Sequence, residues 1–184
     1  MFKPTILTLL FTTALAHSAA PARDPLTMKD PDWIDDRFNQ VEHGNHLHYS
    51  FALPGRKTPK GIAIKVGDNE SATVCFDTLL CSYAGAWTNG FLKLSSRRFG
   101  FTGNAEPAGS LQWTSGMLAG SSDDEGHQDP RERFTSPLPA DHSRYEGLWR
   151  NGQRTILDYT AHGVRVLDHP WLETGNGITA FTRT

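Results

Sequence analysis

Residues 145–167 read YEGLWRNGQRTILDYTAHGVRVL, and this stretch predicts three consecutive antiparallel strands. Asn151-Gly152 is the pair best suited to a two-residue type I′ turn, which requires a positive φ at both central positions. Residues 155–161 then return as a strand, on which Thr155, Leu157 and Tyr159 face one way. His162-Gly163 offers a second turn, and residues 164–167 lead the chain back. The stretch therefore predicts a β-meander.

The same alternation recurs on both sides of the meander, and no segment carries an apolar stripe of helical period. Residues 103–140 have no period at all, so we expect a long irregular central loop there, functional or mobile. One open sheet would leave a face uncovered, so the sequence predicts an all-β, antiparallel β-sandwich-like domain. The further strands are expected at residues 47–53, 62–66, 72–76, 91–94, 98–102 and 178–182.

The start of the chain has the features of a signal peptide. Met1-Phe2-Lys3 is a short basic start, residues 6–15 are mostly apolar, and Ala14-Leu15-Ala16 fits a cleavage site. The apolar run is too short to span a bilayer, so no membrane span is expected after cleavage. We predict a signal peptide over 1–16, an irregular lead-in over 17–45 and one β-rich domain over 46–184, exported to the periplasm or the extracellular space.

Composition excludes several partners and cofactors. With 38% hydrophobic and 21% charged residues the chain is globular, and a formal net charge of −2 gives no field that would recruit nucleic acid. The sequence lacks a P-loop, a dinucleotide fingerprint, a Gly-x-Ser-x-Gly nucleophile elbow and a Cys-x-x-Cys-His haem-attachment motif. No cofactor is predicted.

Cys75 and Cys81 are the two cysteines, and export would permit a disulfide between them. On one straight strand they would lie roughly 20 Å apart, so a bridge requires the chain to reverse near Asp77-Thr78. Two free, half-buried thiols are the alternative.

The sequence offers three kinds of candidate site. His46 and His48 lie two apart on an expected strand, so their side chains leave the same face and could share a metal with a third ligand such as His43. Solvent-facing histidines on an edge strand are the alternative reading. Asp77 and Asp158 are candidate catalytic carboxylates because each lies in or beside a strand, although nothing in the sequence fixes a pair in space.

The five tryptophans give the third kind of site, because the amphipathic indole suits both a core and a sugar-binding surface. Trp87 and Trp113 lie in glycine-rich stretches, so they are the candidates for surface recognition of a ligand, with core filling as the alternative. Trp149 alternates with Gly147 and Tyr145 along its strand, and we expect it in the core.

Several short stretches within residues 30–184 are specific as a set, although no single one of them identifies a family. They are KGIAIKVG (60–67), FDTLL (76–80), YAGAWTNGF (83–91), DPR (129–131), PLP (137–139), YEGLW (145–149), NG (151–152), DYT (158–160) and FTR (181–183). This combination resembles an uncharacterised β-rich domain found near the N-terminus of large exported bacterial proteins. Those proteins often also carry c-type cytochrome, dehydrogenase-like propeller or sugar-processing modules.

The resemblance implies a strand-rich module and supplies no catalytic residue, because that domain has no assigned activity. The chain departs from the pattern at Cys75 and Cys81, where an aliphatic and a polar or basic residue are expected. It also stops at Thr184, where similar proteins continue, so both a stand-alone short version and a truncated reading frame stay open.

The sequence therefore favours a non-catalytic exported binding or scaffold module that faces a polysaccharide or another exported protein module. A glycan-active hydrolase or lyase that uses Asp77 or Asp158 with a histidine is the alternative. A metal-binding domain that uses His46 and His48 is a second, weaker alternative.

Overall fold

The computed structural model describes residues 43–96, 102–122, 128–133 and 135–184. All of them belong to one compact unit of the chain. The expected signal peptide over 1–16 lies outside the described residues, as do most of the lead-in and all but the last residue of the strand expected over 98–102.

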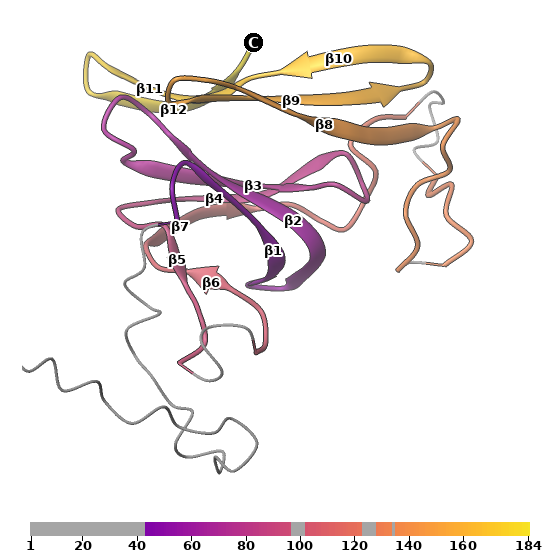
Figure 1. The fold of residues 1–184 in the computed structure, drawn as a ribbon, viewed down its shortest axis with the longest axis horizontal. Helices are drawn as coiled ribbons and strands as arrows, with labels where there is room; N and C mark the ends of the chain where they lie inside the picture. Colours follow the sequence, from indigo (N-terminus) through magenta and orange to yellow (C-terminus); the bar gives the residue numbers. More distant parts are fainter. Residues whose placement is uncertain (1–42, 97–101, 123–127, 134) are drawn as a thin grey trace, which may run out of the picture. The chain divides into compact units, whose positions relative to one another are not determined.

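The described residues form twelve strands in four antiparallel sheets and contain no helix, which confirms the all-β prediction (Figure 1). The main sheet has the strand order β1-β2-β3-β4-β7 and the second sheet the order β10-β9-β8, while β11 pairs with β12 and β5 with β6. The strands are β1 (His46–Leu53), β2 (Arg56–Val66), β3 (Ala72–Asp77), β4 (Ser82–Thr88), β5 (Leu92–Lys93), β6 (Glu106–Pro107), β7 (Ser110–Thr114), β8 (Ser143–Asn151), β9 (Arg154–Ala161), β10 (Val164–Asp168), β11 (Pro170–Gly175) and β12 (Ile178–Arg183).

The predicted meander is β8-β9-β10, with one change in its turns. Asn151 pairs with Arg154, so Gly152 and Gln153 are the two loop residues, and only Gly152 has a positive φ, of 61°. This fits a type II′ turn with glycine at the first central position, and corrects the expected type I′ turn at Asn151-Gly152. His162-Gly163, with φ values of 49° and 76°, supplies the positive pair that type I′ requires.

The expected central loop over 103–140 is shorter than predicted, because β6 and β7 lie inside it. β7 joins the main sheet as an edge strand beside β4. All five of its side chains are exposed. The alternation in its sequence is limited to Leu111 and Trp113 on either side of Gln112, which is too short to predict a strand.

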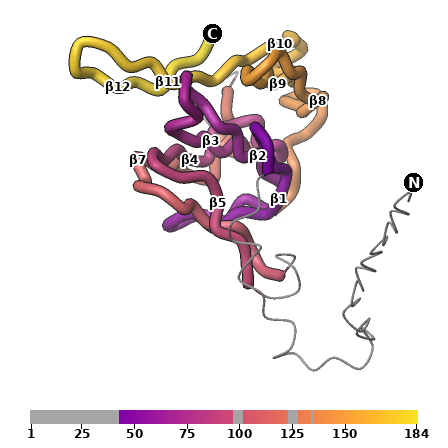
Figure 2. Tube along the Cα trace, turned by 60° about the vertical axis from the view of Figure 1, so that its left-hand side comes forward, coloured from indigo at the N-terminus to yellow at the C-terminus, as the bar shows by residue number. Residues whose placement is uncertain are grey.

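β3 is the centre of the fold, since all six of its residues are buried. Alternate side chains along β3 feed two apolar clusters on opposite faces of the main sheet. Phe76 belongs to the cluster shared with Leu157 of β9 and Leu172 of β11, so the β8–β10 sheet and the β11–β12 hairpin cover the same face (Figures 1 and 2). Cys75 belongs to the opposite cluster, with Phe51 of β1 and Trp87 of β4. Each fully buried large apolar side chain of this kind contributes about 1.5–3 kcal/mol.

Candidate functional site

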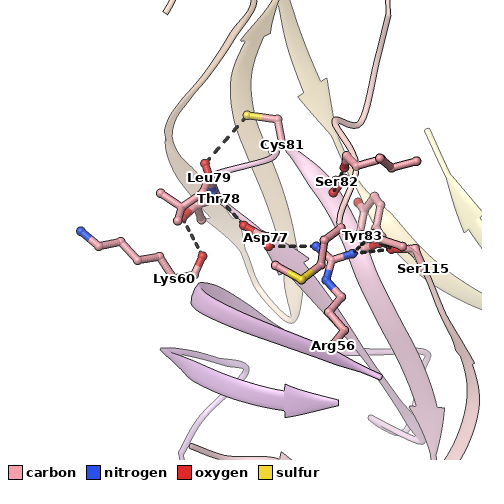
Figure 3. Close-up of polar contacts among 12 residues, drawn as sticks. Arg56, Lys60, Asp77, Thr78, Leu79, Cys81, Ser82, Tyr83 and Ser115 are labelled. Atoms are coloured by element: carbon pink, nitrogen blue, oxygen red, sulfur yellow. Dashed lines mark hydrogen bonds and ion pairs between the residues drawn. The ribbon is translucent and has the colours of Figure 1, made fainter. Parts of the chain in front are cut away.

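Asp77 ends β3 and is held in a structural ion pair. Its Oδ2 accepts a hydrogen bond from Nη2 of Arg56 at 2.8 Å, and its Oδ1 accepts one from the backbone N–H of Leu79 at 2.9 Å (Figure 3). Both charged side chains are 1% exposed. Both carboxylate oxygens therefore have partners within the protein, and the charge is neutralised by an equally buried guanidinium.

The same arginine attaches the end of β7 to this turn. Nη1 of Arg56 donates to Oγ of Ser115 at 2.5 Å and to the carbonyl of Gly116 at 2.6 Å (Figure 3). Ser115 in turn donates to the carbonyl of Tyr83 at 2.6 Å. This network links β2, β3, β4 and the segment after β7, which is the role of a core polar network.

Asp158 of β9 lies on the other side of the second sheet from Asp77. Its neighbours Leu157 and Tyr159 face the core, so Asp158 faces away from it. Arg165 donates from Nε to Oδ1 at 3.0 Å and from Nη2 to Oδ2 at 2.7 Å. The hydrogen bonds from Arg165 and Trp149 lower the pKa of Asp158 to about 2. Asp77 and Asp158 are thus not brought together, and each is occupied by its own arginine.

Asp168, at the end of β10, is clamped in a similar way. Arg183 of β12 donates from Nε to its Oδ1 at 3.2 Å, and the hydroxyl of Tyr159 donates to its Oδ2 at 3.1 Å. The Asp168 side chain is 2% exposed. It holds the β11–β12 hairpin against the meander and is not open to a ligand.

The structure reverses the predicted positions of Trp87 and Trp149 and leaves Trp113 at the surface. Trp87 is 0% exposed and donates from Nε1 to the carbonyl of Phe91 at 2.7 Å, so it is a core residue and not the expected surface residue. Trp113 of β7 is 37% exposed and borders a small cavity that Tyr83 and Phe181 also line. Trp149, expected in the core, is 57% exposed.

A β-bulge explains the position of Trp149. Tyr145 pairs with Tyr159, but Gly147 pairs with Asp158 rather than with Leu157, so the register of β8 shifts by one residue. A shift of one residue turns every following side chain to the other face of the sheet. Trp149 therefore leaves the core face that Tyr145 occupies.

Trp149 lies on an open, apolar and charged surface, which we call the Trp149 platform: Gly147, Trp149, Asp158, Arg165 and Leu167. Nε1 of Trp149 donates to Oδ2 of Asp158 at 3.0 Å, which fixes the indole. Leu167, the cross-strand partner of Asp158, is 54% exposed. A Cβ atom at Gly147 would meet nothing within 4 Å, so the surface beside the indole is open. Sequence alternation missed this platform because it cannot reveal a bulge.

His46 and His48 leave one face of β1 as predicted, with ring centroids 5.6 Å apart. Burial lowers the pKa of both histidines, and the neighbouring His48 and Arg150 lower that of His46 further. His43 instead contacts the ring of Phe91, with centroids 6.3 Å apart. In the described part of the chain, no three His, Cys, Asp or Glu residues come together as a metal-binding group.

Cys75 and Cys81 are free, so the disulfide considered from the sequence is not formed. The chain does reverse after Asp77, but the two cysteines pack in clusters on opposite faces of the main sheet. Burial raises the pKa of the Cys75 thiol above its usual range and that of Cys81 to about 12. Both thiols are buried rather than half-buried.

Within the described ranges, no helix is long and apolar enough to cross a membrane.

Comparison with known proteins yields one match. No curated protein and no solved structure matches the chain. The family model described as a domain of unknown function, DUF6797, matches residues 74–168. The matched segment runs from within β3 to the end of β10, more than half of the chain, and includes Asp77, Trp149 and Asp158. It agrees with the resemblance to an uncharacterised domain, and the chain belongs to the DUF6797 family.

Proposed function

We propose that the chain is a non-catalytic, exported binding module that faces carbohydrate, and that Trp149 is its principal sugar-contacting residue. The observation that carries the proposal is an indole that is 57% exposed and yet fixed by a hydrogen bond to Asp158. A flat aromatic face of fixed orientation suits the C–H-lined face of a pyranose ring. Because the indole is already oriented, little side-chain entropy is lost when a sugar stacks on it.

The groups beside the indole supply polar contacts. Nε and Nη2 of Arg165 are used by Asp158, while Nη1 has no hydrogen-bond partner among the described residues. The Arg165 side chain is 61% exposed. It can therefore donate to a sugar hydroxyl next to the stacked ring, which combines an apolar contact with a directional one.

The size of the surface favours a sugar over a folded protein partner. The exposed apolar groups on this face are the single indole and Leu167, surrounded by charged side chains. A stable protein interface buries about 800 Å² on each partner around an apolar core. One or two sugar rings need much less area.

The candidate catalytic acids support binding rather than hydrolysis. A glycosidase needs two carboxyl groups across the scissile bond, roughly 5–10 Å apart, and one of them must hold a proton near neutral pH. Asp77 and Asp158 lie in different sheets with both oxygens of each occupied, and the pKa of Asp158 is lowered rather than raised. A hydrolase or lyase is therefore the second candidate and an outcome of the test.

Export is part of the proposal and rests on residues 1–16, which have the features of a signal peptide. The resemblance to modules of large exported bacterial proteins supports the same compartment. In such a protein this module would hold redox or glycan-degrading neighbours near a polysaccharide.

The test is retention on insoluble cellulose, chitin and xylan. We expect the wild-type protein to be retained on at least one of them, and Trp149→Ala to weaken that retention by roughly tenfold or more. Trp113→Ala is the matched control, because it removes a partly exposed indole from another sheet. Equal retention of both variants, or no retention of the wild type, would overturn the proposal. Release of soluble sugar that is lost in Asp158→Asn would favour the hydrolase.

A further inference from the structure

A second candidate site is a cavity of about 520 Å³ on the opposite side of β8 from the platform. Its walls come from β1, the middle of β2, the turn after β3, and Tyr145 of β8. Tyr145 precedes the bulge and Trp149 follows it, so they leave opposite faces of the strand. The lining residues that matter for the argument are His48, Tyr49, Ser50, Lys60, Thr78 and Tyr145.

Two hydroxyl groups of the cavity are oriented as hydrogen-bond acceptors. Oγ of Ser50 donates its hydrogen to the carbonyl of Pro59 at 2.7 Å. Oγ1 of Thr78 donates to the carbonyl of Lys60 at 2.8 Å, as Figure 3 shows. A hydroxyl has one hydrogen and two lone pairs, so toward a ligand each of these groups can only accept. They therefore suit a ligand that carries several hydroxyl donors.

The charge of the cavity is positive. Nζ of Lys60 has no hydrogen-bond partner among the described residues, and none of the residues that line the cavity is acidic. Burial lowers the pKa of His48, which disfavours a positive charge on its imidazole. Burial, followed by the charge of Asp158, raises the pKa of Tyr145 to about 12, so its phenol keeps its proton. The one full charge offered to a ligand is the ammonium of Lys60.

We propose that this cavity binds a polyhydroxylated carboxylate, such as the uronic-acid residue of an acidic polysaccharide. Lys60 pairs with the carboxylate, Ser50 and Thr78 accept from sugar hydroxyls, and the tyrosine rings border the apolar edge of the sugar. The site does not depend on a ligand at the Trp149 platform, because the two surfaces lie on opposite faces of β8.

The test is calorimetric titration of the whole protein with hexagalacturonate and with its fully methyl-esterified form, which keeps the sugar rings and removes the charge. We expect binding of the acid and at least tenfold weaker binding of the ester. Lys60→Gln should weaken acid binding to the level of the ester. Lys57→Gln is the matched control, because the exposed Lys57 is two residues from the wall residue Pro59 and does not line this cavity. Galactonate and galacturonate, titrated separately, distinguish a free hydroxy acid from a sugar ring.

Three results would overturn the proposal: no binding of the acid, equal binding of acid and ester, or acid binding that is unchanged in Lys60→Gln. The variant Trp149→Ala distinguishes failure of this proposal from failure of the proposed function. It should leave hexagalacturonate binding at the cavity unchanged while it weakens retention on insoluble polysaccharide by roughly tenfold or more. The two proposals can therefore fail independently.

Discussion

The indole of Trp149 donates a hydrogen bond from Nε1 to Oδ2 of Asp158 at 3.0 Å, on the face of the meander that points away from the core. Asp158 in turn accepts two hydrogen bonds from Arg165 of the neighbouring strand. Three adjacent strands thus hold one exposed aromatic ring. Single exposed hydrophobic residues are common on protein surfaces. An exposed ring that is also held in one orientation by hydrogen bonds is therefore a better indication of a binding surface.

The stability of this clamp should depend on pH. The pKa of Asp158 is about 2 in the folded protein, below the ordinary value near 4. A carboxyl whose folded pKa is lowered contributes stability above its unfolded pKa and loses it as pH falls toward the folded pKa. We expect wild type to melt at a higher temperature than Asp158→Asn between pH 5 and 7, and the difference to shrink between pH 4 and 2. A difference that stays constant down to pH 2 would contradict the clamp.

The Arg56–Asp77 pair should be costly to break by removing one partner, and less costly to replace as a pair. Both side chains are 1% exposed, so Asp77→Ala leaves a buried, uncompensated guanidinium. Loss of one partner from a buried pair costs about 3–5 kcal/mol, whereas replacing both by apolar groups is often neutral. Urea unfolding of Asp77→Ala, Arg56→Met and the double variant Arg56→Met/Asp77→Leu measures this. If Asp77→Ala costs under about 1 kcal/mol, as for an exposed pair, then the pair is not structural.

The two thiols should be unreactive in the folded protein. Cys75 is 0% and Cys81 6% exposed, and burial raises the pKa of both, so little thiolate forms at pH 8. We expect no alkylation by iodoacetamide within an hour under native conditions, and addition of two groups in guanidinium chloride without reductant. A mass two hydrogens lower, with labelling only after reduction, would show a disulfide and contradict the packing of the cysteines on opposite faces.

Much of the fold follows from sequence because it depends on local patterns. Asn151-Gly152 and His162-Gly163 mark the ends of strands that alternate, and this is sufficient to predict the meander. β7 was missed for a physical reason. A strand at the edge of the sheet with five exposed side chains buries no alternating face, so backbone pairing with β4 defines it.

The candidate site was less predictable. The alternation of Tyr145, Gly147 and Trp149 predicts a common face, but a bulge between the first two turns the tryptophan outward. A bulge depends on the pairing of two strands and leaves no clear period in either. The prediction for Trp87 failed for a related reason. Its glycine-rich surroundings indicate exposure, but β1, β3 and β5 bury it, and these tertiary contacts are not visible in the local sequence.

The most direct test of the account measures the indole N–H of Trp149 by NMR while a soluble oligosaccharide is added. Cellohexaose, chitohexaose and xylohexaose are titrated separately, and Trp149→Phe assigns the signal. The account predicts that one of these sugars shifts the Trp149 signal in a saturable manner, while the buried Trp87 signal stays in place. A Trp149 signal that no sugar shifts, in a protein that nevertheless binds one of them, would contradict the central claim.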